Sequence, residues 1–458
     1  MSQVDNALKN AAGKLEMIRQ QRRLPSVSAA AAYNGRIIWQ EACGFTDMET
    51  KRPASPETVY PLGSITKVFS VTMLMQLVEQ GIVSLEDPVA KYIPEYQVRS
   101  PFPGTLPTTL RQLAAHTSGL PRDAAINFPM NHSLGDWEFS DGQAPLQWYA
   151  SAEDVLASLP TVVLELPPDT AKIYSNLGIM LLGLALERAD HQDFGAYIAD
   201  RIFAPLGMTS AGFLNDTVAW GGRFPLGYGF SSKNGSLFKA PSWRLGGAMY
   251  TGGIYATAAD LVRFSAAFMV EPSPILTAAS IQRMIHPAAM GDTHLGWWKG
   301  FHAGYANFGH AGAHVGFISA VLFVPELNLA VAVQTNRWNP IFDTNDSTEI
   351  ARWLLGELIP SAELDRKPFS AEAVELECYE GVYRLPGNYA SATVAISGSR
   401  DGILFVLEGV PANPMYLVPV GDHQFGLPGT QFPVVSFQAD SSGDITTLSY
   451  ALFNFYKE

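Results

Sequence analysis

The sequence predicts an α+β protein: an antiparallel β-sheet flanked by helices, together with an all-helical region, and then a small C-terminal antiparallel β-barrel. Three observations support this fold class. Strand-like runs occur near both ends of the first 360 residues, and helical patterns fill the stretch between them. Beyond residue 376, short alternating strands are separated by turns and no helical pattern is evident. Charged residues make up only 16% of the chain, below the usual ~25%, which indicates a large buried interior.

We expect the chain to divide into domains where its pattern of predicted secondary structure changes. A length of 458 residues exceeds what one ordinary hydrophobic core supports. Residues 361–375 are charged and interrupted by proline, so we expect a linker there. We therefore predict one domain over residues 1–360 and a second over 376–458, the latter a barrel of roughly 80 residues.

Two apolar hairpins frame the first domain. Residues 27–33 and 36–43 are strand-like and are joined by Asn34-Gly35, a strong hairpin signal because both turn positions need positive φ. Residues 316–324 and 329–335 form the second hairpin, around a turn at 325–328. Residues 1–23 mix charges with scattered apolar positions, so they predict an amphipathic helix and not a signal peptide.

Helices are expected between the hairpins. The run from Val68 to Val78 is apolar nearly all round and carries no charge before Glu79, which predicts a helix buried inside the domain. The segment 227–253 is dense in glycine, serine and aromatic residues, which suggests short strands and turns. Further helical patterns span 108–115, 152–159, 177–189, 194–202, 258–269 and 350–358.

Composition excludes several classes of partner. The net charge is −13, from 30 basic and 43 acidic residues, and no basic run occurs, which argues against nucleic acid. Cys43 and Cys378 fall in different predicted domains, so no disulfide framework is indicated. No apolar stretch reaches the ~20 residues that span a bilayer. We expect a soluble cytoplasmic protein with no membrane partner, or a periplasmic one if a leader has been removed.

Ser64 and Lys67 stand at the head of the predicted buried helix. Residues three apart share one helix face, and the unpaired N–H groups of a helix start would stabilise an alkoxide on Ser64. Partial burial of Lys67 would lower its pKa and let it accept a proton. A serine beside a base is the minimum for an acyl-enzyme mechanism. The alternative is an N-cap serine next to a solvated lysine.

Tyr174 and Asn176 precede a second apolar helix pattern. A phenol held near Lys67 could pass a proton, because a neighbouring ammonium lowers its pKa. The Asn176 amide can both donate to and accept from a substrate amide. The alternative for Tyr174 is a buried tyrosine whose hydroxyl bonds to the backbone.

The third candidate is His310-Ala311-Gly312, which leads into the apolar strand at 316–324. Gly312 would let a substrate backbone approach the strand edge, and the N–H of Ala313 could polarise a carbonyl. The alternative for His310 is a loop histidine, since His-x-Gly also occurs at His294, His302 and His314.

Together these stretches resemble the serine β-lactamase and penicillin-binding-protein superfamily, in particular its class C-like branch of β-lactamases, D-Ala-D-Ala carboxypeptidases, D-aminopeptidases and related esterases. The resemblance covers about residues 15–358, and residues 376–458 look like the lipocalin-like barrel appended to some peptidases of this group. The motifs that carry the resemblance are YPLGSITK (60–67), LAAHTSGL (113–120), YSNLG (174–178), PLGM (205–208), GGIYATAADL (252–261) and GHAG (309–312).

The resemblance implies a β-lactamase/transpeptidase-like fold and a role for each matching residue. Ser64 would be the nucleophile, Lys67 its base or proton relay, and Tyr174 the second proton-transfer group. Asn176 would bind a substrate amide, and the backbone N–H groups of Ser64 and Ala313 would form the oxyanion hole. The choice of acylation base between Lys67 and Tyr174 stays open.

The third motif departs from the β-lactamase pattern, which has lysine followed by a hydroxyl residue. His310 is expected to titrate near neutrality, and Ala311 has no hydroxyl, so this pair should hold a substrate carboxylate less well. We therefore expect a free substrate carboxylate to matter less than is usual in this group. We expect hydrolysis of a small amide, a short peptide containing a D-amino acid, or an ester, with weak or no β-lactam turnover.

Other functions remain as alternatives. Within the same class these are a carboxylesterase or a true class C-like β-lactamase. Outside it stands a non-catalytic protein that binds penicillin or peptidoglycan fragments. No Gly-x-Ser-x-Gly elbow, zinc motif or nucleotide fingerprint occurs, so we expect no metal or other cofactor. The predicted partner is a small molecule or short peptide, and homo-oligomerisation is left open.

Overall fold

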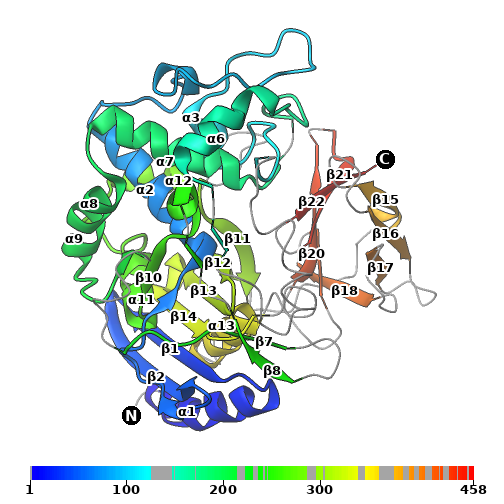
Figure 1. Ribbon diagram of the computed structural model, residues 1–458. Helices are drawn as coiled ribbons and strands as arrows, with labels where there is room; N and C mark the ends of the chain where they lie inside the picture. The colour runs from blue at the N-terminus through cyan, green and yellow to red at the C-terminus, as the bar shows by residue number, and fades with distance from the viewer. Residues whose placement is uncertain are drawn as a thin grey trace.

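Figure 1 shows the computed structural model of the chain, with a helical region above a central sheet and a separate group of strands beside them. The structure describes residues 3–124, 147–148, 150–170, 172–213, 222–230, 236–240, 243–244, 246–285, 295–302, 305–338, 346–359, 376–384, 391–396, 402–407, 415–421, 423–426, 433–440, 442–450 and 453–457.

The central sheet confirms the predicted antiparallel architecture. It has seven strands in the order β11-β12-β13-β14-β1-β2-β3, and each pairs antiparallel with its neighbours. The N-terminal hairpin thus lies beside the strands that close the region, because β1 pairs with β14. The strands are β1 (Ser26–Tyr33), β2 (Arg36–Asp47), β3 (Arg52–Pro53), β11 (Trp298–His302), β12 (Tyr305–His314), β13 (Phe317–Val324) and β14 (Leu329–Thr335).

Both expected hairpins form. Asn34 and Gly35 between β1 and β2 have φ of 50° and 73°, as a two-residue turn of this hand requires. The turn between β13 and β14 is a 3₁₀ segment, η7 (Pro325–Leu327), which ends at Asn328 in the left-handed conformation. The sequence reasoning missed β11, whose glycine and lysine hide its strand pattern.

The middle strands are apolar throughout because both faces of the sheet are covered. Along β1, Ala29 and Ala31 pack into one core and Ala30 and Ala32 into another, as the two-residue strand period dictates. The first core joins the sheet to α1 (Gln3–Gln21) and α13 (Asp346–Leu358). The second joins it to the helical region. The predicted amphipathic N-terminal helix is α1, which covers one face with its apolar side.

Helix α2 (Thr66–Glu79) runs through the middle of the helical region. Its residues 66 to 77 are all buried, which confirms the predicted internal helix. Around it lie α3 (Leu110–Ala115), α6 (Ala152–Ser158), α7 (Asn176–Asp190), α8 (Phe194–Ile198), a π-helical turn (Ala199–Phe203), α9 (Ala204–Leu206), α10 (Met249–Gly252), α11 (Ala258–Ala266) and α12 (Ala278–Ile285), with 3₁₀ segments at Val89–Lys91, Leu159–Thr161 and Gly246–Ala248.

Short strands complete this region, as the composition of 227–253 suggested. A three-stranded sheet has the order β4-β10-β6, and two further pairs are β5 with β9 and β7 with β8. These strands are β4 (Tyr60–Pro61), β5 (Gln147–Trp148), β6 (Gly212–Phe213), β7 (Tyr228–Phe230), β8 (Leu237–Lys239), β9 (Trp243–Arg244) and β10 (Ile254–Ala256).

The C-terminal strands close into a barrel in chain order, β15 to β22, as predicted. Its core holds Tyr383, Phe405, Leu417, Phe425 and Phe437, preceded by a 3₁₀ turn at Leu376–Tyr379. The strands are β15 (Gly381–Arg384), β16 (Ser391–Ile396), β17 (Ile403–Leu407), β18 (Met415–Gly421), β19 (Gln424–Gly426), β20 (Pro433–Ala439), β21 (Ile445–Tyr450) and β22 (Phe453–Lys457). The expected linker at 361–375 lies outside the described residues, so the boundaries at 360 and 376 stay a prediction.

The barrel touches the first region through β22. The Tyr456 hydroxyl accepts a hydrogen bond of 2.8 Å from the backbone N–H of Lys172 and lies 3.3 Å from its carbonyl oxygen, to which it donates. In the described part of the chain, no helix is long and apolar enough to cross a bilayer.

A buried ion pair ties the two helices on the outer face to the sheet. Asp346, at the start of α13, bonds to Arg337 just after β14 and to Arg22 just after α1, the latter at 2.5 Å. Asp346 and Arg337 are 2% and 4% exposed. An ion pair this deep is costly to break because the remaining charge has no water.

We predict that Asp346→Asn destabilises the protein by about 3 kcal/mol, since it removes the buried carboxylate charge that pairs with both Arg337 and Arg22. Urea unfolding followed by tryptophan fluorescence measures this loss. Glu95→Gln is the matched control: its ion pair with Arg188 is largely exposed, and its loss should cost less than about 1 kcal/mol. Equal stabilities of the two variants would contradict the prediction.

Candidate active site

Ser64 lies in a tight turn and not in the helix proper. The turn is a 3₁₀ segment, η1 (Gly63–Ile65), and α2 begins at Thr66. The expected helix start at Ser64 is therefore wrong by one short turn, although the two segments are continuous. Gly63 has φ of +52°, a conformation that residues with a side chain rarely adopt. Ser64 is half-buried, while Lys67, the second residue of α2, is only 2% exposed.

Lys67 is held against Ser64. Its Nζ donates to Ser64 Oγ at 2.9 Å and to the Thr251 carbonyl, at the end of α10, at 3.1 Å. Burial lowers the pKa of Lys67 well below its ordinary value, the Arg122 guanidinium lowers it further, and Asp123 partly opposes this. The geometry therefore presents the serine hydroxyl to an amine that loses its proton more readily than a solvated lysine.

Tyr174 comes from the extended segment before α7 and faces the same pair. Lys67 Nζ lies 5.0 Å from the centre of its ring. Its hydroxyl oxygen is buried and has no hydrogen-bond partner among the described residues. Burial raises the pKa of Tyr174 to about 12, although the Ser64 hydroxyl and Arg122 lower it in part. The phenol thus stays protonated at neutral pH and has a proton to give.

His116 positions the Tyr174 segment, a role that sequence reasoning missed although the residue lies in a quoted motif. Its carbonyl accepts from Ile173 N–H at 2.9 Å, and its Nδ1 accepts from Ser175 N–H at 3.1 Å. Its ring packs on Tyr174 with centres 4.6 Å apart. Burial, with several nearby cations, holds the pKa of His116 well below its usual range, so the ring is neutral and Nδ1 can accept.

Asn176 is the first residue of α7 and is buried. Its Nδ2 donates to Asp123 Oδ1 at 2.8 Å, which fixes the direction of the amide. Asp123 also lies 3.5 Å from Arg122 Nε. Sequence reasoning did not single out Arg122 or Asp123, because a charged pair in a loop carries no periodic signal.

His310, Gly312 and Ala313 all lie within β12, beside η1, and not in a turn before the strand. His310 is buried, and its Nδ1 lies 2.6 Å from the carbonyl of Ala311. Burial lowers its pKa to about 3, and the charges of Lys67 and Lys172 contribute. The expectation that His310 titrates near neutrality is therefore wrong: the ring has lost the water that would solvate an imidazolium.

Two glycines let β12 approach the serine turn. A Cβ on Gly312 would lie 1.8 Å from the carbonyl oxygen of Leu62 and 2.8 Å from the nitrogen of Ser64. A Cβ on Gly63 would lie 2.5 Å from the carbonyl oxygen of Ala313. All three distances are shorter than any that a real Cβ atom adopts. The backbones of Ser64 and Ala313 are therefore brought close together, the arrangement that a two-amide oxyanion hole needs.

The structure thus brings Ser64, Lys67 and Tyr174 into one group and places β12 directly beside it. The sequence matches the family described as Beta-lactamase over residues 9–352. The chain belongs to the β-lactamase family. Solved structures with this fold include a D-amino acid amidase and a β-lactamase/D-alanine carboxypeptidase.

Relatives and solved structures agree with this assignment. "Beta-lactamase-like protein 2" of Dictyostelium discoideum is 30% identical over 277 residues, covering 59% of this chain and 47% of that protein. The chain thus spans about half the length of this relative. The octameric penicillin-binding protein homologue from Pyrococcus abyssi has a TM-score of 0.64 at 23% identity, covering 97% and 99% of the two chains. The D-amino acid amidase from Ochrobactrum anthropi has a TM-score of 0.63 at 22% identity, covering 79% and 100%. At these identities the likeness to the two structures concerns the fold.

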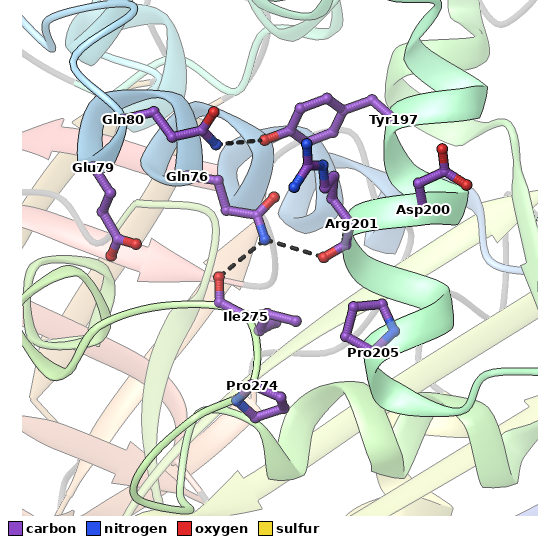
Figure 2. A pocket seen from close by; sticks show the side chains of 9 residues that line it. All are labelled: Gln76, Glu79, Gln80, Tyr197, Asp200, Arg201, Pro205, Pro274 and Ile275. Carbon is purple, nitrogen blue, oxygen red and sulfur yellow. Dashed lines mark hydrogen bonds between the residues drawn. The ribbon is translucent and has the colours of Figure 1, made fainter.

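A pocket at the opposite end of α2 belongs to helix packing and not to this group. It has a volume of about 250 Å³ and is lined by Gln76, Glu79 and residues of α8 and the following π-helical turn (Figure 2). Gln76 Nε2 donates to the carbonyls of Ile275 and Arg201 at 2.9 and 3.2 Å, so its amide ties three segments together. Gln76 is nine residues beyond Lys67, roughly 14 Å along a helix.

We predict that Gly312→Ala slows the reaction of Ser64 with a fluorophosphonate by at least about 10-fold, because the new methyl group forces β12 away from the Ser64 turn. Labelling rates followed by intact-protein mass spectrometry measure this. Gly13→Ala is the control, because its Cβ would meet no atom within 4 Å. Equal labelling of both variants would mean that the close approach does not set the reactivity of Ser64.

Proposed function

We propose that the protein is a serine hydrolase that forms an acyl-enzyme on Ser64 and cleaves a small amide, a short peptide containing a D-amino acid, or an ester. The observation that carries this proposal is the 2.9 Å contact between Lys67 Nζ and Ser64 Oγ inside a buried site. A pure binding protein has no need of a desolvated amine beside a serine.

Lys67 is the better candidate for the acylation base. Its pKa is lowered, mainly by burial, whereas that of Tyr174 is raised to about 12 by burial. Lys67 would take the proton of Ser64 as the hydroxyl oxygen attacks the carbonyl carbon. Tyr174, still protonated, would then give a proton to the leaving group and recover one from Lys67. The backbone N–H groups of Ser64 and Ala313 would stabilise the oxyanion, and Asn176 would bind the substrate amide.

Two observations support the proposed substrate preference. Structures with this fold include a D-amino acid amidase and a β-lactamase/D-alanine carboxypeptidase. His310 is neutral above about pH 3, so position 310 provides no charge for a β-lactam carboxylate. We expect nitrocefin turnover to be weak or absent and hydrolysis of p-nitrophenyl esters or D-amino-acid amides to be faster.

Assembly is a separate proposal. The Pyrococcus abyssi homologue is described as octameric, and it covers nearly this whole chain. We propose that this chain also forms a homo-oligomer. Light scattering coupled to size-exclusion chromatography tests this, and a monomer at micromolar concentration would contradict it.

We predict that Ser64→Ala abolishes both the covalent fluorophosphonate adduct and ester hydrolysis, and that Lys67→Met lowers kcat/KM for a neutral ester by about 100-fold or more. Mass spectrometry and a rate panel of p-nitrophenyl esters, D-amino-acid amides and nitrocefin measure these effects. Wild-type protein that binds penicillin without an adduct at Ser64 would instead support the rival, a non-catalytic binding protein.

We also predict the direction of the pH dependence. Because the neutral amine of Lys67 is the active form, kcat/KM for a neutral ester should rise with pH and level off well below pH 10.5. His310 should add no limb between pH 5 and 8, since burial lowers its pKa to about 3. A pH–rate profile on p-nitrophenyl pentanoate measures this. A rising limb centred near 10.5 would contradict a buried, perturbed base.

A further inference from the structure

Two adjacent carbonyl groups at the end of α10 are bonded to side chains of α2. Lys67 Nζ donates to the Thr251 carbonyl at 3.1 Å. Ser70 Oγ donates to the Tyr250 carbonyl at 2.7 Å. Lys67 and Ser70 are three residues apart and therefore lie on one face of α2. Because the last carbonyls of a helix have no partner within it, this face of α2 supplies the donors that the end of α10 lacks.

Ser70 is a buried hydroxyl in a helix that is otherwise apolar around it. It is 0% exposed, and it lies one turn of α2 beyond Lys67. A buried hydroxyl is unfavourable unless it is hydrogen-bonded, and the bond to the Tyr250 carbonyl satisfies this one. The same bond joins α10 to α2 one residue before the carbonyl that Lys67 reaches.

The side chain of Tyr250 is held by α7. A Cβ on Gly183 would lie 2.5 Å from the Tyr250 ring, so the ring packs directly on the backbone of α7. The Tyr250 hydroxyl donates to Glu187 Oε2 at 3.3 Å. The chain at Tyr250 is thus bonded to α7 through its side chain and to α2 through its carbonyl. The bond from Ser70 therefore sets how closely Thr251 approaches α2.

The Thr251 carbonyl can orient the amine of Lys67. A neutral amine accepts the Ser64 proton only if its one lone pair points at Ser64 Oγ. An N–H directed at the Thr251 carbonyl leaves the lone pair for Ser64 Oγ, which is 2.9 Å away. Once the proton has moved, the carbonyl also stabilises the ammonium as a hydrogen-bond acceptor. A nucleophile, a base and a third group that orients the base are the usual parts of such an arrangement.

We propose that Ser70 is a positioning residue of the active site: it holds α10 so that the Thr251 carbonyl orients the Lys67 amine towards Ser64. This inference rests on the proposed hydrolase function with Lys67 as the base. It adds to that function a residue that acts through Lys67, by way of the backbone of α10.

Ser70→Ala tests the proposal, and Ser265→Ala is the matched control. Ser265 is also 0% exposed, and its hydroxyl donates to the Val262 carbonyl within its own helix, α11. For Ser70→Ala we expect the plateau of kcat/KM on p-nitrophenyl pentanoate to fall about 10-fold or more, because the base is misaligned. The rising limb of the pH profile should move to lower pH, because the Lys67 ammonium loses an acceptor. Ser265→Ala should change neither.

The limb reports on Lys67 because Ser70 has no described bond to any other titratable or charged group around it. Those groups come from other elements and are Tyr174, Arg122, Asp123, His116 and His310. A general loss of structure would lower the plateau and leave the position of the limb unchanged.

The outcomes separate the role of Ser70 from the hydrolase function. If hydrolysis depends on Ser64 but Ser70→Ala keeps the plateau, or its limb stays in place or moves to higher pH, the role of Ser70 is wrong and the function stands. If Ser64→Ala leaves hydrolysis unchanged, the function fails and the role of Ser70 with it. Should Ser70→Ala not fold, as judged by thermal unfolding, Ser70→Cys replaces it, since a thiol is a weak donor, and the same comparison decides.

Discussion

The structure depends on keeping one amine out of water beside one hydroxyl. Lys67 is the second residue of α2, and the first twelve residues of that helix are all buried. Among the described residues, the Lys67 amine donates to Ser64 Oγ and to the Thr251 carbonyl. Removing an ammonium from water is unfavourable, so the folded protein favours its neutral form. The apolar core around α2 therefore does more than stabilise the fold. It sets the protonation of the group that makes Ser64 nucleophilic.

A second constraint concerns distance between backbones. Strand β12 can lie against the Ser64 turn only because Gly63 and Gly312 have no side chains at the point of contact. The same approach brings the backbone of Ala313 to that of Ser64. Strand β12 is held in the seven-stranded sheet between β11 and β13, and the Ser64 turn leads directly into α2, so the two halves of the group belong to different layers of the fold. The reactivity of Ser64 therefore depends on how the sheet and the helical region pack against each other.

Charge completes the arrangement. His310 and His116 are neutral because they are buried, which leaves Arg122 as a cation 5.2 Å from the centre of the Tyr174 ring, with Asp123 engaged by Asn176. The barrel reaches this region through Tyr456, whose hydroxyl accepts from the backbone N–H of Lys172 and donates to its carbonyl oxygen.

The sequence alone determined the α+β class, both hairpins, the buried helix after Ser64 and the barrel, because each follows from local periodicity or turn chemistry. It also singled out Ser64, Lys67 and Tyr174, through short motifs on the elements that hold them. It could not determine how far individual polar side chains are buried, because that depends on neighbours far along the chain: His310 was expected to titrate near neutrality, and burial lowers its pKa to about 3. Nor could it single out His116, Arg122 or Asp123 as parts of the site. Loop residues carry no periodic signal, and only the packing of α3, α7 and β22 around residues 172–176 decides what those side chains face.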